Sequence, residues 1–169
     1  MQRLELVHDW LARQFPGRPL SVAPASADAS FRRYFRITFD DGLTRIVMDA
    51  PPEHEDCRPF VHVAGLLHEA GVHAPEILAQ DLDRGLLLLT DLGSTTYLDA
   101  LDASNADVLF RDALDALVKW QLASRPDALP PYDEALLRRE LNLFPDWYVA
   151  RHLGSPLTAP QQEVLEQVQ

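Results

Sequence analysis

The stretch Leu86-Leu87-Leu88-Leu89-Thr90-Asp91-Leu92-Gly93 is an apolar run that ends in a short polar turn. It follows Gly71-Val72-His73-Ala74-Pro75-Glu76-Ile77-Leu78, which has the composition of a helix end leading into a strand. The connection Asp81-Leu82-Asp83-Arg84-Gly85 is typical of a hairpin turn. The sequence therefore predicts strands at about 76–81 and 85–90, and the second of them continues into a linker.

Upstream of this hairpin, the pattern predicts one helix and three strands. Leu4, Val7, Leu11 and Phe15 recur at helical spacing, and Pro16-Gly17 ends that helix. The strands that we expect next are, in order, 20–26, 31–38 and 43–50.

Residues 31–38 alternate as in a strand with two different faces. One face holds Phe31, Arg33, Phe35 and Ile37, and the other holds Arg32, Tyr34, Arg36 and Thr38. Asp40-Asp41-Gly42 is a hairpin turn, and Pro51-Pro52 ends the next strand because proline cannot donate to the ladder.

A second helix is expected over 55–70, with Gly71 as its C-terminal cap. Its apolar face is formed by Phe60, Val63, Leu66 and Leu67. The predicted fold class is α+β: a five-stranded antiparallel sheet from about 20 to 91, with this helix packed on one face.

From Thr95 onward the chain is predicted to be helical. The helix over 133–153 should be kinked or split by Pro145. Val108, Leu109, Ala113, Leu114, Leu117 and Trp120 are spaced for one buried face. Phe144, Trp147 and Tyr148 could stack on a sugar, although such a stripe is more often core.

The last residues, Thr158-Ala159-Pro160-Gln161, fit a capping box that starts another helix. Only eight residues follow Gln161, and such a short helix is marginal on its own. We therefore expect the natural chain to continue. The expected domains are 1–92, a small lobe, and 93–169, part of a helical lobe.

Composition excludes several classes of protein. The net charge of −11 argues against a general nucleic-acid binder. Cys57 is the single cysteine, so no internal disulfide forms. The sequence has no apolar run of membrane-spanning length and no signal-peptide core at its start. We expect a soluble, cytoplasmic protein that binds neither nucleic acid nor membrane.

The order of these elements resembles the small lobe of the aminoglycoside phosphotransferase and choline kinase-like superfamily. Three motifs are similar to the N-acetylmuramate/N-acetylglucosamine anomeric kinases of cell-wall recycling. They are Tyr34-Phe35-Arg36, Val47-Met48-Asp49-Ala50-Pro51-Pro52 and Leu89-Thr90-Asp91-Leu92-Gly93. The resemblance spans the whole chain but about half of such an enzyme.

The resemblance implies an ATP site at the linker. The Thr90 carbonyl would accept from the adenine amino group, the Leu92 amide would donate to the ring, and adenine would lie between Val47 and Leu89. The turn at 26–30 would cover the phosphates. The implied nucleotide-binding residues are Ser30, Arg32, Arg33, Val47, Met48, Leu89, Thr90, Asp91 and Leu92.

The sequence departs from the usual kinase pattern at the phosphates. The turn at 26–30 lacks glycine, so its backbone cannot approach phosphate as freely as a glycine-rich loop. Met48 occupies the position at which kinase small lobes carry a lysine, paired with a glutamate on the next helix. Phosphate binding would then depend on arginine, on metal, or on a further part of the protein.

We expect no catalytic residue and no metal ligand in this chain. His54-Glu55-Asp56 imitates the start of a kinase catalytic loop, but Val61 stands where the asparagine should be. Asp81 and Asp83 are favoured for turn geometry alone. Four residues could be considered for zinc, but their spacing fits no usual zinc pattern: Cys57, His62, His68 and His73.

Two hypotheses follow. The first is the ATP-binding N-terminal portion of a small-molecule phosphotransferase, either an amino-sugar kinase of peptidoglycan recycling or another kinase of that superfamily. It would use ATP and Mg²⁺, with the metal ligands in a following part of the protein. The second is a noncatalytic binding or scaffold domain. The coding sequence after Gln169 would discriminate between them.

Overall fold

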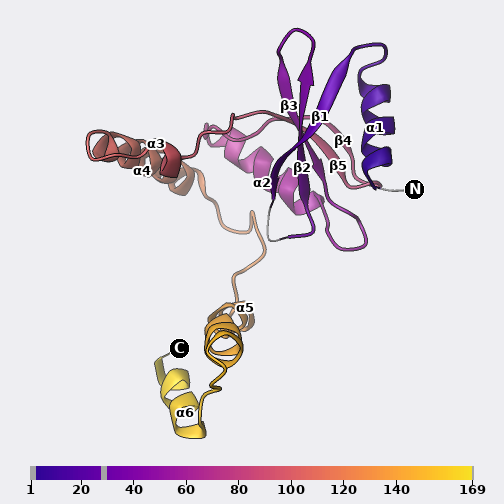
Figure 1. Ribbon diagram of the computed structural model, residues 1–169. Coiled ribbons are helices and arrows are strands. Elements are labelled where there is room, and N and C mark those ends of the chain that lie inside the picture. Colours follow the sequence, from indigo (N-terminus) through magenta and orange to yellow (C-terminus); the bar gives the residue numbers. More distant parts are fainter. Residues whose placement is uncertain (1–2, 28–29, 169) are drawn as a thin grey trace. The chain divides into compact units, whose positions relative to one another are not determined.

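A computed structural model describes residues 3–27 and 30–168 of the chain. Residues 20–90 form a five-stranded antiparallel sheet with the strand order β1-β2-β3-β5-β4 (Figure 1). The strands are β1 Leu20–Ala27, β2 Arg33–Phe39, β3 Thr44–Asp49, β4 Ile77–Asp81 and β5 Leu86–Thr90. The predicted α+β class and the antiparallel pairing are confirmed.

The hairpin between β2 and β3 closes where the sequence predicts. Gly42 has a φ of +80°, which glycine adopts at no steric cost, and its amide donates to the Phe39 carbonyl. β2 begins two residues later than predicted, because the Phe31 ring leaves the sheet and stacks on His54. The predicted turn at 26–30 contains Asp28 and Ala29, which lie outside the described residues.

The helix α1, Arg3–Gln14, covers one face of the sheet (Figure 1). Its inward side is Val7, Trp10 and Leu11, the positions that recur at helical spacing. They pack against strand residues that share one face of the sheet: Phe35, Ile37, Phe39, Val47, Leu86 and Leu88. This cluster is the larger of the two buried cores, and we call it the α1-side core.

The helix α2, Arg58–Glu69, packs on the opposite face. Phe60 and Val61 contact a second buried cluster, the α2-side core, made of Met48, Ala50, Cys57, Leu87 and Leu89. The helix starts three residues later than predicted. The Glu55 side chain instead pairs with Arg32, and the backbone before it turns on the Pro51 carbonyl.

The end of α2 follows the prediction. Gly71, with a φ of +70°, donates its amide to the His68 carbonyl, and Val72 donates to the Leu67 carbonyl. This left-handed ending is a common way to satisfy the last carbonyls of a helix.

The remaining described elements are helical, as predicted from Thr95 onward. They are α3 Tyr97–Ala100, α4 Ala106–Ala123, α5 Glu134–Leu141, the π-helix η1 Phe144–His152 and α6 Ala159–Val168. The expected helix over 133–153 is split into α5 and η1 just before Pro145. At Thr158, the backbone amide and hydroxyl both donate to the Gln161 side chain, which is the glutamine half of the predicted capping box.

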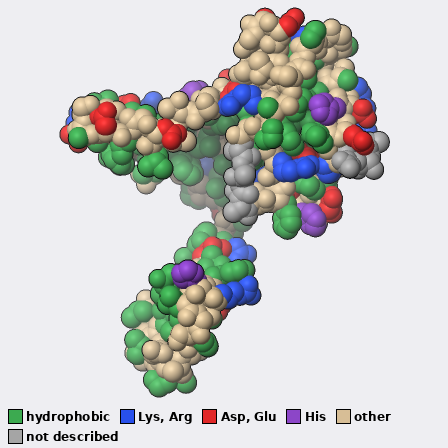
Figure 2. Space-filling model, in the orientation of Figure 1, with side chains coloured by type: hydrophobic (Ala, Val, Ile, Leu, Met, Phe, Trp, Pro, Cys, Tyr) green, Lys and Arg blue, Asp and Glu red, His purple; other side chains and the backbone are tan. Residues whose placement is uncertain are grey.

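The prediction that these helices bury their apolar residues is wrong for the described chain. Val108, Leu114, Leu117 and Trp120 of α4 are exposed, and so are Phe144, Trp147 and Tyr148 of η1. Figure 2 shows hydrophobic side chains at the surface of the helical segments. Spacing predicts that a face is apolar, but burial also needs a partner surface, and no described element covers these faces.

The backbone separates into two compact units, residues 1–124 and residues 125–169. The first contains the sheet, both of its covering helices, α3 and α4. The second contains α5, η1 and α6. The lobe boundary between residues 92 and 93 stays a prediction. Among the described helices, none combines the length and apolar character needed to cross a membrane.

Candidate nucleotide site

A cavity of about 320 Å³ lies on the α2 side of the sheet, where β5 ends. Small-molecule sites usually have volumes of about 300–1,000 Å³. The cavity combines apolar side chains from the sheet with the linker that follows β5. Its lining residues are Ala25, Tyr34, Arg36, Ile46, Phe60, Pro75, Leu89, Thr90, Asp91, Leu92 and Gly93. The linker residues predicted for the nucleotide site, Leu89 to Leu92, therefore share one cavity.

The apolar walls come from neighbouring strands. Ile46 of β3 and Leu89 of β5 are register partners, and both side chains line the cavity. Val47, the next residue along β3, is fully buried in the α1-side core. Successive strand residues point to opposite faces, so the structure does not bring Val47 to this site. Ile46 lines the cavity in its place.

The linker backbone is held on both sides of Leu92. The Thr90 amide donates to the Glu76 carbonyl at 3.0 Å, and the Thr90 hydroxyl accepts from the Glu76 amide at 2.9 Å. The Gly93 amide donates to Asp91 Oδ1 at 2.9 Å. Within residues 3–27 and 30–168, the Leu92 amide has no hydrogen-bond partner. Among the described residues, the Leu92 amide is thus an unused donor beside an apolar cavity.

Arg36 and Asp91 form a two-point ion pair in the cavity wall. Arg36 Nε donates to Asp91 Oδ2 at 2.6 Å and Arg36 Nη2 donates to Asp91 Oδ1 at 3.0 Å, while Nη2 also reaches the Gly93 carbonyl at 2.9 Å. The hydrogen bond from Arg36 lowers the pKa of Asp91 to about 2, with further help from the Gly93 amide and Thr44. Asp91 is therefore ionised at neutral pH and already occupied by protein partners.

Arg32 lies at the edge of a neighbouring cavity of about 360 Å³, which shares Phe60 and Pro75 with the first. Its guanidinium pairs with Glu55 at 3.1 Å. Burial alone would lower the pKa of Arg32, but hydrogen bonding and charge attraction from Glu55, and more weakly from Tyr34, reverse this and raise it. The Ser30 hydroxyl accepts from the Arg32 amide at 3.1 Å. Ser30 and Arg32 therefore stay together on the predicted phosphate side.

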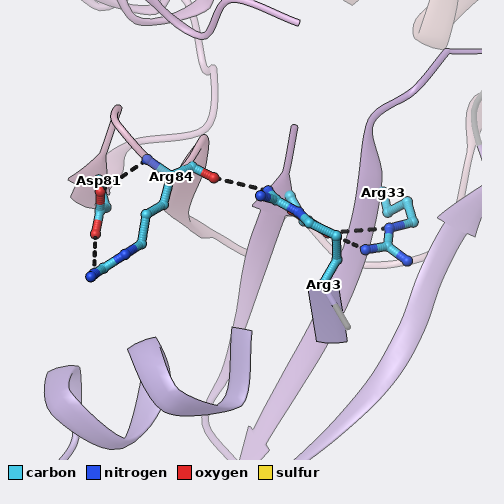
Figure 3. Close-up of polar contacts among 5 residues, drawn as sticks. Arg3, Arg33, Asp81 and Arg84 are labelled. Carbon is cyan, nitrogen blue, oxygen red and sulfur yellow. Dashed lines mark hydrogen bonds and ion pairs between the residues drawn. The ribbon is translucent and has the colours of Figure 1, made fainter. Parts of the chain in front are cut away.

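Arg33 is held on the other face of the sheet. It pairs with Asp49, whose side chain is fully buried, and its guanidinium lies over Phe35 of the α1-side core. Arg3 of α1 binds the same carboxylate and donates to the Arg84 carbonyl at 2.8 Å (Figure 3). The structure therefore does not place Arg33 with Arg32 near the cavities.

Met48 is fully buried in the α2-side core, opposite Tyr34 and Leu87 in the sheet. Its thioether packs with apolar neighbours and supplies no charge. The position at which kinases place a lysine is thus part of the hydrophobic core. On this face of the sheet, Arg32 carries a positive charge at the edge of the neighbouring cavity, and Glu55, from the segment before α2, holds its guanidinium.

Seven lining residues were not among those predicted, and two of them, Ile46 and Arg36, matter most for the shape and charge of the cavity. The alternation of β2 already put Arg36 on the same face as Arg32 and Tyr34, so part of the signal was present. Its partner Asp91 is 55 residues away in sequence, and nothing local connects them. Among the described residues, no three histidine, cysteine, aspartate or glutamate side chains gather as they would around a metal ion.

The chain was compared with protein-family models and with curated proteins. The model of the phosphotransferase enzyme family matches residues 21–169. That range includes the sheet except for Leu20, the first residue of β1, together with the cavity and the linker.

Several curated proteins are similar to this chain. The chain is 64% identical over 139 residues to the N-acetylmuramate/N-acetylglucosamine kinase of Pseudomonas aeruginosa, which is 82% of this chain and 41% of that protein. It is 55% identical over 148 residues to the protein of the same name from Pseudomonas putida, covering 88% and 43%. For the Neisseria meningitidis protein of that name the identity is 41% over 171 residues, covering 99% and 51%. The chain spans about half the length of the curated relatives it matches.

Proposed function

The chain belongs to the phosphotransferase enzyme family, and from this premise we propose that it is the ATP-binding portion of an amino-sugar kinase. The names of its relatives support N-acetylmuramate and N-acetylglucosamine as substrates of the whole protein. We also propose a cytoplasmic location, since such a kinase needs access to ATP.

One observation supports this function more than any other. An apolar cavity between Ile46 and Leu89 ends at a linker whose Leu92 amide is unused within the described residues. Adenine is a flat aromatic ring whose faces pack on apolar side chains and whose edge carries an acceptor nitrogen next to an amino donor. It fits a slot that supplies apolar walls and one N–H, and a nearby carbonyl such as that of Thr90 would accept from the amino group.

The proposed site differs from the predicted one at three residues. Ile46 replaces Val47 as the β3 wall, Met48 supports that wall from the core, and Arg33 is left out. Leu89, Thr90 and Leu92 keep their roles at the ring, and Asp91 holds the linker. On the phosphate side we propose Ser30 and Arg32, because Arg32 borders the adjoining cavity and Glu55 orients its guanidinium.

Mg²⁺ would neutralise charge on the transferred phosphate, as in other kinases. We propose that its ligands, together with the base for the sugar hydroxyl, come from the part of the protein outside these 169 residues. The residues of this chain would bind and orient the nucleotide.

Calorimetric titration of ATP into the full-length protein tests the linker assignment. Leu92→Pro removes the backbone N–H that faces the ring, and a lost hydrogen bond is worth about 1 kcal/mol, which is roughly fivefold in Kd. Leu92→Ala is the matched control, because it keeps the amide and should bind ATP nearly as tightly as the parent. A Leu92→Pro protein that folds normally and binds ATP with unchanged Kd would show that the linker does not hold adenine.

The phosphate assignment has its own test. Arg32→Ala should weaken ATP binding but leave adenosine binding unchanged, and it should make ATP binding less sensitive to salt, since partly exposed charge contacts are screened. Equal weakening of ATP and adenosine would move Arg32 away from the phosphates. Failure of the parent protein to bind either ligand would instead favour a noncatalytic domain.

A further inference from the structure

Arg36 and Asp91 close a ring of contacts around the linker. The Asp91 carboxylate takes both Arg36 contacts and also accepts from the Gly93 amide, while Arg36 donates to the Gly93 carbonyl. Both backbone polar groups of Gly93 are thereby engaged. Leu92 lies between Asp91 and Gly93, so the peptide that carries its amide is fixed from both directions.

This pair differs from an ordinary surface ion pair. The Asp91 side chain is 5% exposed, and Arg36 approaches it with two nitrogens in the forked geometry that arginine forms with carboxylates. Arg18–Asp41 and Arg84–Asp81, by comparison, have aspartates that are 56% and 21% exposed. A desolvated, two-point contact holds its geometry better than an exposed single contact does.

The contact also connects distant parts of the site. Arg36 comes from the middle of β2 and itself lines the cavity, whereas Asp91 and Gly93 belong to the linker after β5. On the other side of Leu92 in the sequence, the Thr90 amide donates to the Glu76 carbonyl. Between these anchors, the Leu92 amide has no partner within the described residues.

We propose that Arg36 and Asp91 act as a linker clamp, a pair of positioning residues that sets nucleotide affinity by fixing the Leu92 amide before the ring arrives. The proposal rests on the proposed function, since it assigns the purine ring to this linker. Binding to a group already held in place loses less conformational freedom than binding to a mobile one. The clamp should therefore affect the base and not the phosphates.

The experiment measures Kd for adenosine and for ATP in the full-length protein by calorimetry. Arg36→Ala and Asp91→Asn should each weaken the binding of both ligands by the same factor, up to about fivefold, since a misplaced amide costs no more than the lost hydrogen bond itself. The double variant should bind no more weakly than the weaker single variant, because both substitutions remove one clamp. Arg36→Lys should restore little affinity, since lysine cannot make the forked contact.

Arg84→Ala is the matched control, because it removes an arginine paired with an aspartate in the turn between β4 and β5. It should leave both Kd values unchanged. The binding stoichiometry shows whether a variant is folded, so partial unfolding is not mistaken for a change in Kd. The amide signal of Leu92 in nuclear magnetic resonance should shift on adding adenosine to the parent and shift less in the Arg36→Ala protein.

Unchanged adenosine affinity in folded Arg36→Ala and Asp91→Asn proteins would overturn the clamp while leaving the proposed function in place. Loss of ATP affinity alone, with adenosine unaffected, would also overturn it, because that result would place Arg36 at the phosphates. A parent protein that binds neither ligand would overturn the proposed function, and the clamp with it.

Discussion

At Gly85 the chain passes so close to Ala50 that a larger residue does not fit. Gly85 has a φ of +67°, and a Cβ built on it would lie 1.8 Å from the Ala50 carbonyl oxygen. The Ala50 amide donates to the Gly85 carbonyl at 2.8 Å, which draws the end of β3 against the turn between β4 and β5. Backbone geometry and close contact both select glycine here.

Gly85→Ala should therefore destabilise the protein by more than a left-handed backbone alone explains. The conformational cost is about 1 kcal/mol, and the clash with backbone atoms should raise the total to roughly 3 kcal/mol or more. Gly42→Ala is the matched comparison, since Gly42 has a φ of +80° with nothing within 4 Å of the added Cβ. Urea unfolding of both variants measures the difference, and equal losses would contradict the close approach.

The stability of the folded protein should depend on pH through the ionisation of Asp91. Its pKa is about 2 in the folded protein, below its ordinary value of 3.8, mainly because of the hydrogen bond from Arg36. Because the pKa of Asp91 is lower in the folded protein than in the unfolded chain, its ionised form stabilises the fold. This stabilisation is complete above the pKa of the unfolded chain, and it is lost as the pH falls from about 4 to about 2. The linkage amounts to about 2 kcal/mol.

Urea unfolding between pH 5 and pH 2 measures this dependence. The difference in stability between the parent and Asp91→Asn should shrink across that window, because protonation removes in the parent what the substitution removes in the variant. A difference that stays constant with pH would contradict the assigned role of Arg36.

At the scale of elements, one buried carboxylate connects four segments. Asp49, at the end of β3, is fully buried and binds Arg3 of α1 and Arg33 of β2. Arg3 also donates to the Arg84 carbonyl in the turn between β4 and β5 (Figure 3). Apolar packing places α1 on the sheet, and this cluster fixes where its first turn lies.

Asp49→Ala should loosen that connection. The substitution leaves Arg3 and Arg33 close together without their shared anion. Because both arginines are partly exposed, we expect the free energy of unfolding to fall by roughly 2–3 kcal/mol, at or below the usual range for a broken buried pair. Asp41→Asn, which removes the charge that pairs with Arg18 but keeps an oxygen to accept from the Leu43 amide, should cost at most about 1 kcal/mol. Chemical denaturation compares the two, and hydrogen exchange in α1 should rise in Asp49→Ala only. Similar losses in both variants would mean that the cluster does not anchor α1.

At the scale of the whole chain, the sheet and the later helices differ in how they are stabilised. The sheet has two buried cores, one on each face. The helices α4 and η1 expose large apolar side chains, among them Leu122, which is 82% exposed. The cavity beside the linker lies wholly in the first compact unit, residues 1–124.

We expect the 169-residue chain alone to show no phosphotransfer. Positioning of the acceptor hydroxyl and of the metal ions provides most of the catalysis in phosphoryl transfer, and no segment of this sequence has the spacing of a kinase catalytic loop. The assay follows ADP release from ATP in the presence of N-acetylmuramate or N-acetylglucosamine, with the full-length protein as the positive control. Sugar-dependent turnover by the purified chain would refute the expectation.

The sequence by itself determined the order of elements and the family. The alternation of 31–38, the Asp41-Gly42 turn and the Gly71 helix end are local signals, and local backbone preferences suffice to produce them. The short motifs at residues 34–36, 47–52 and 89–93 led to the phosphotransferase family, which the match over residues 21–169 confirms. The position of the linker is also a local signal, since an apolar strand that stops at a polar turn is visible in the sequence.

Only the tertiary structure decided which side chains meet at the site. Ile46-Val47-Met48 and Leu86 to Leu89 are apolar throughout because α1 and α2 cover opposite faces of the sheet, so alternation cannot tell one face from the other. The sequence pattern therefore could not show that Ile46, and not Val47, lines the cavity. Arg36 and Asp91 meet across 55 residues, and Arg33 turns to Asp49 while Arg32 turns to Glu55. Such pairings depend on strand order and register, which bring together residues that have no local signal in common.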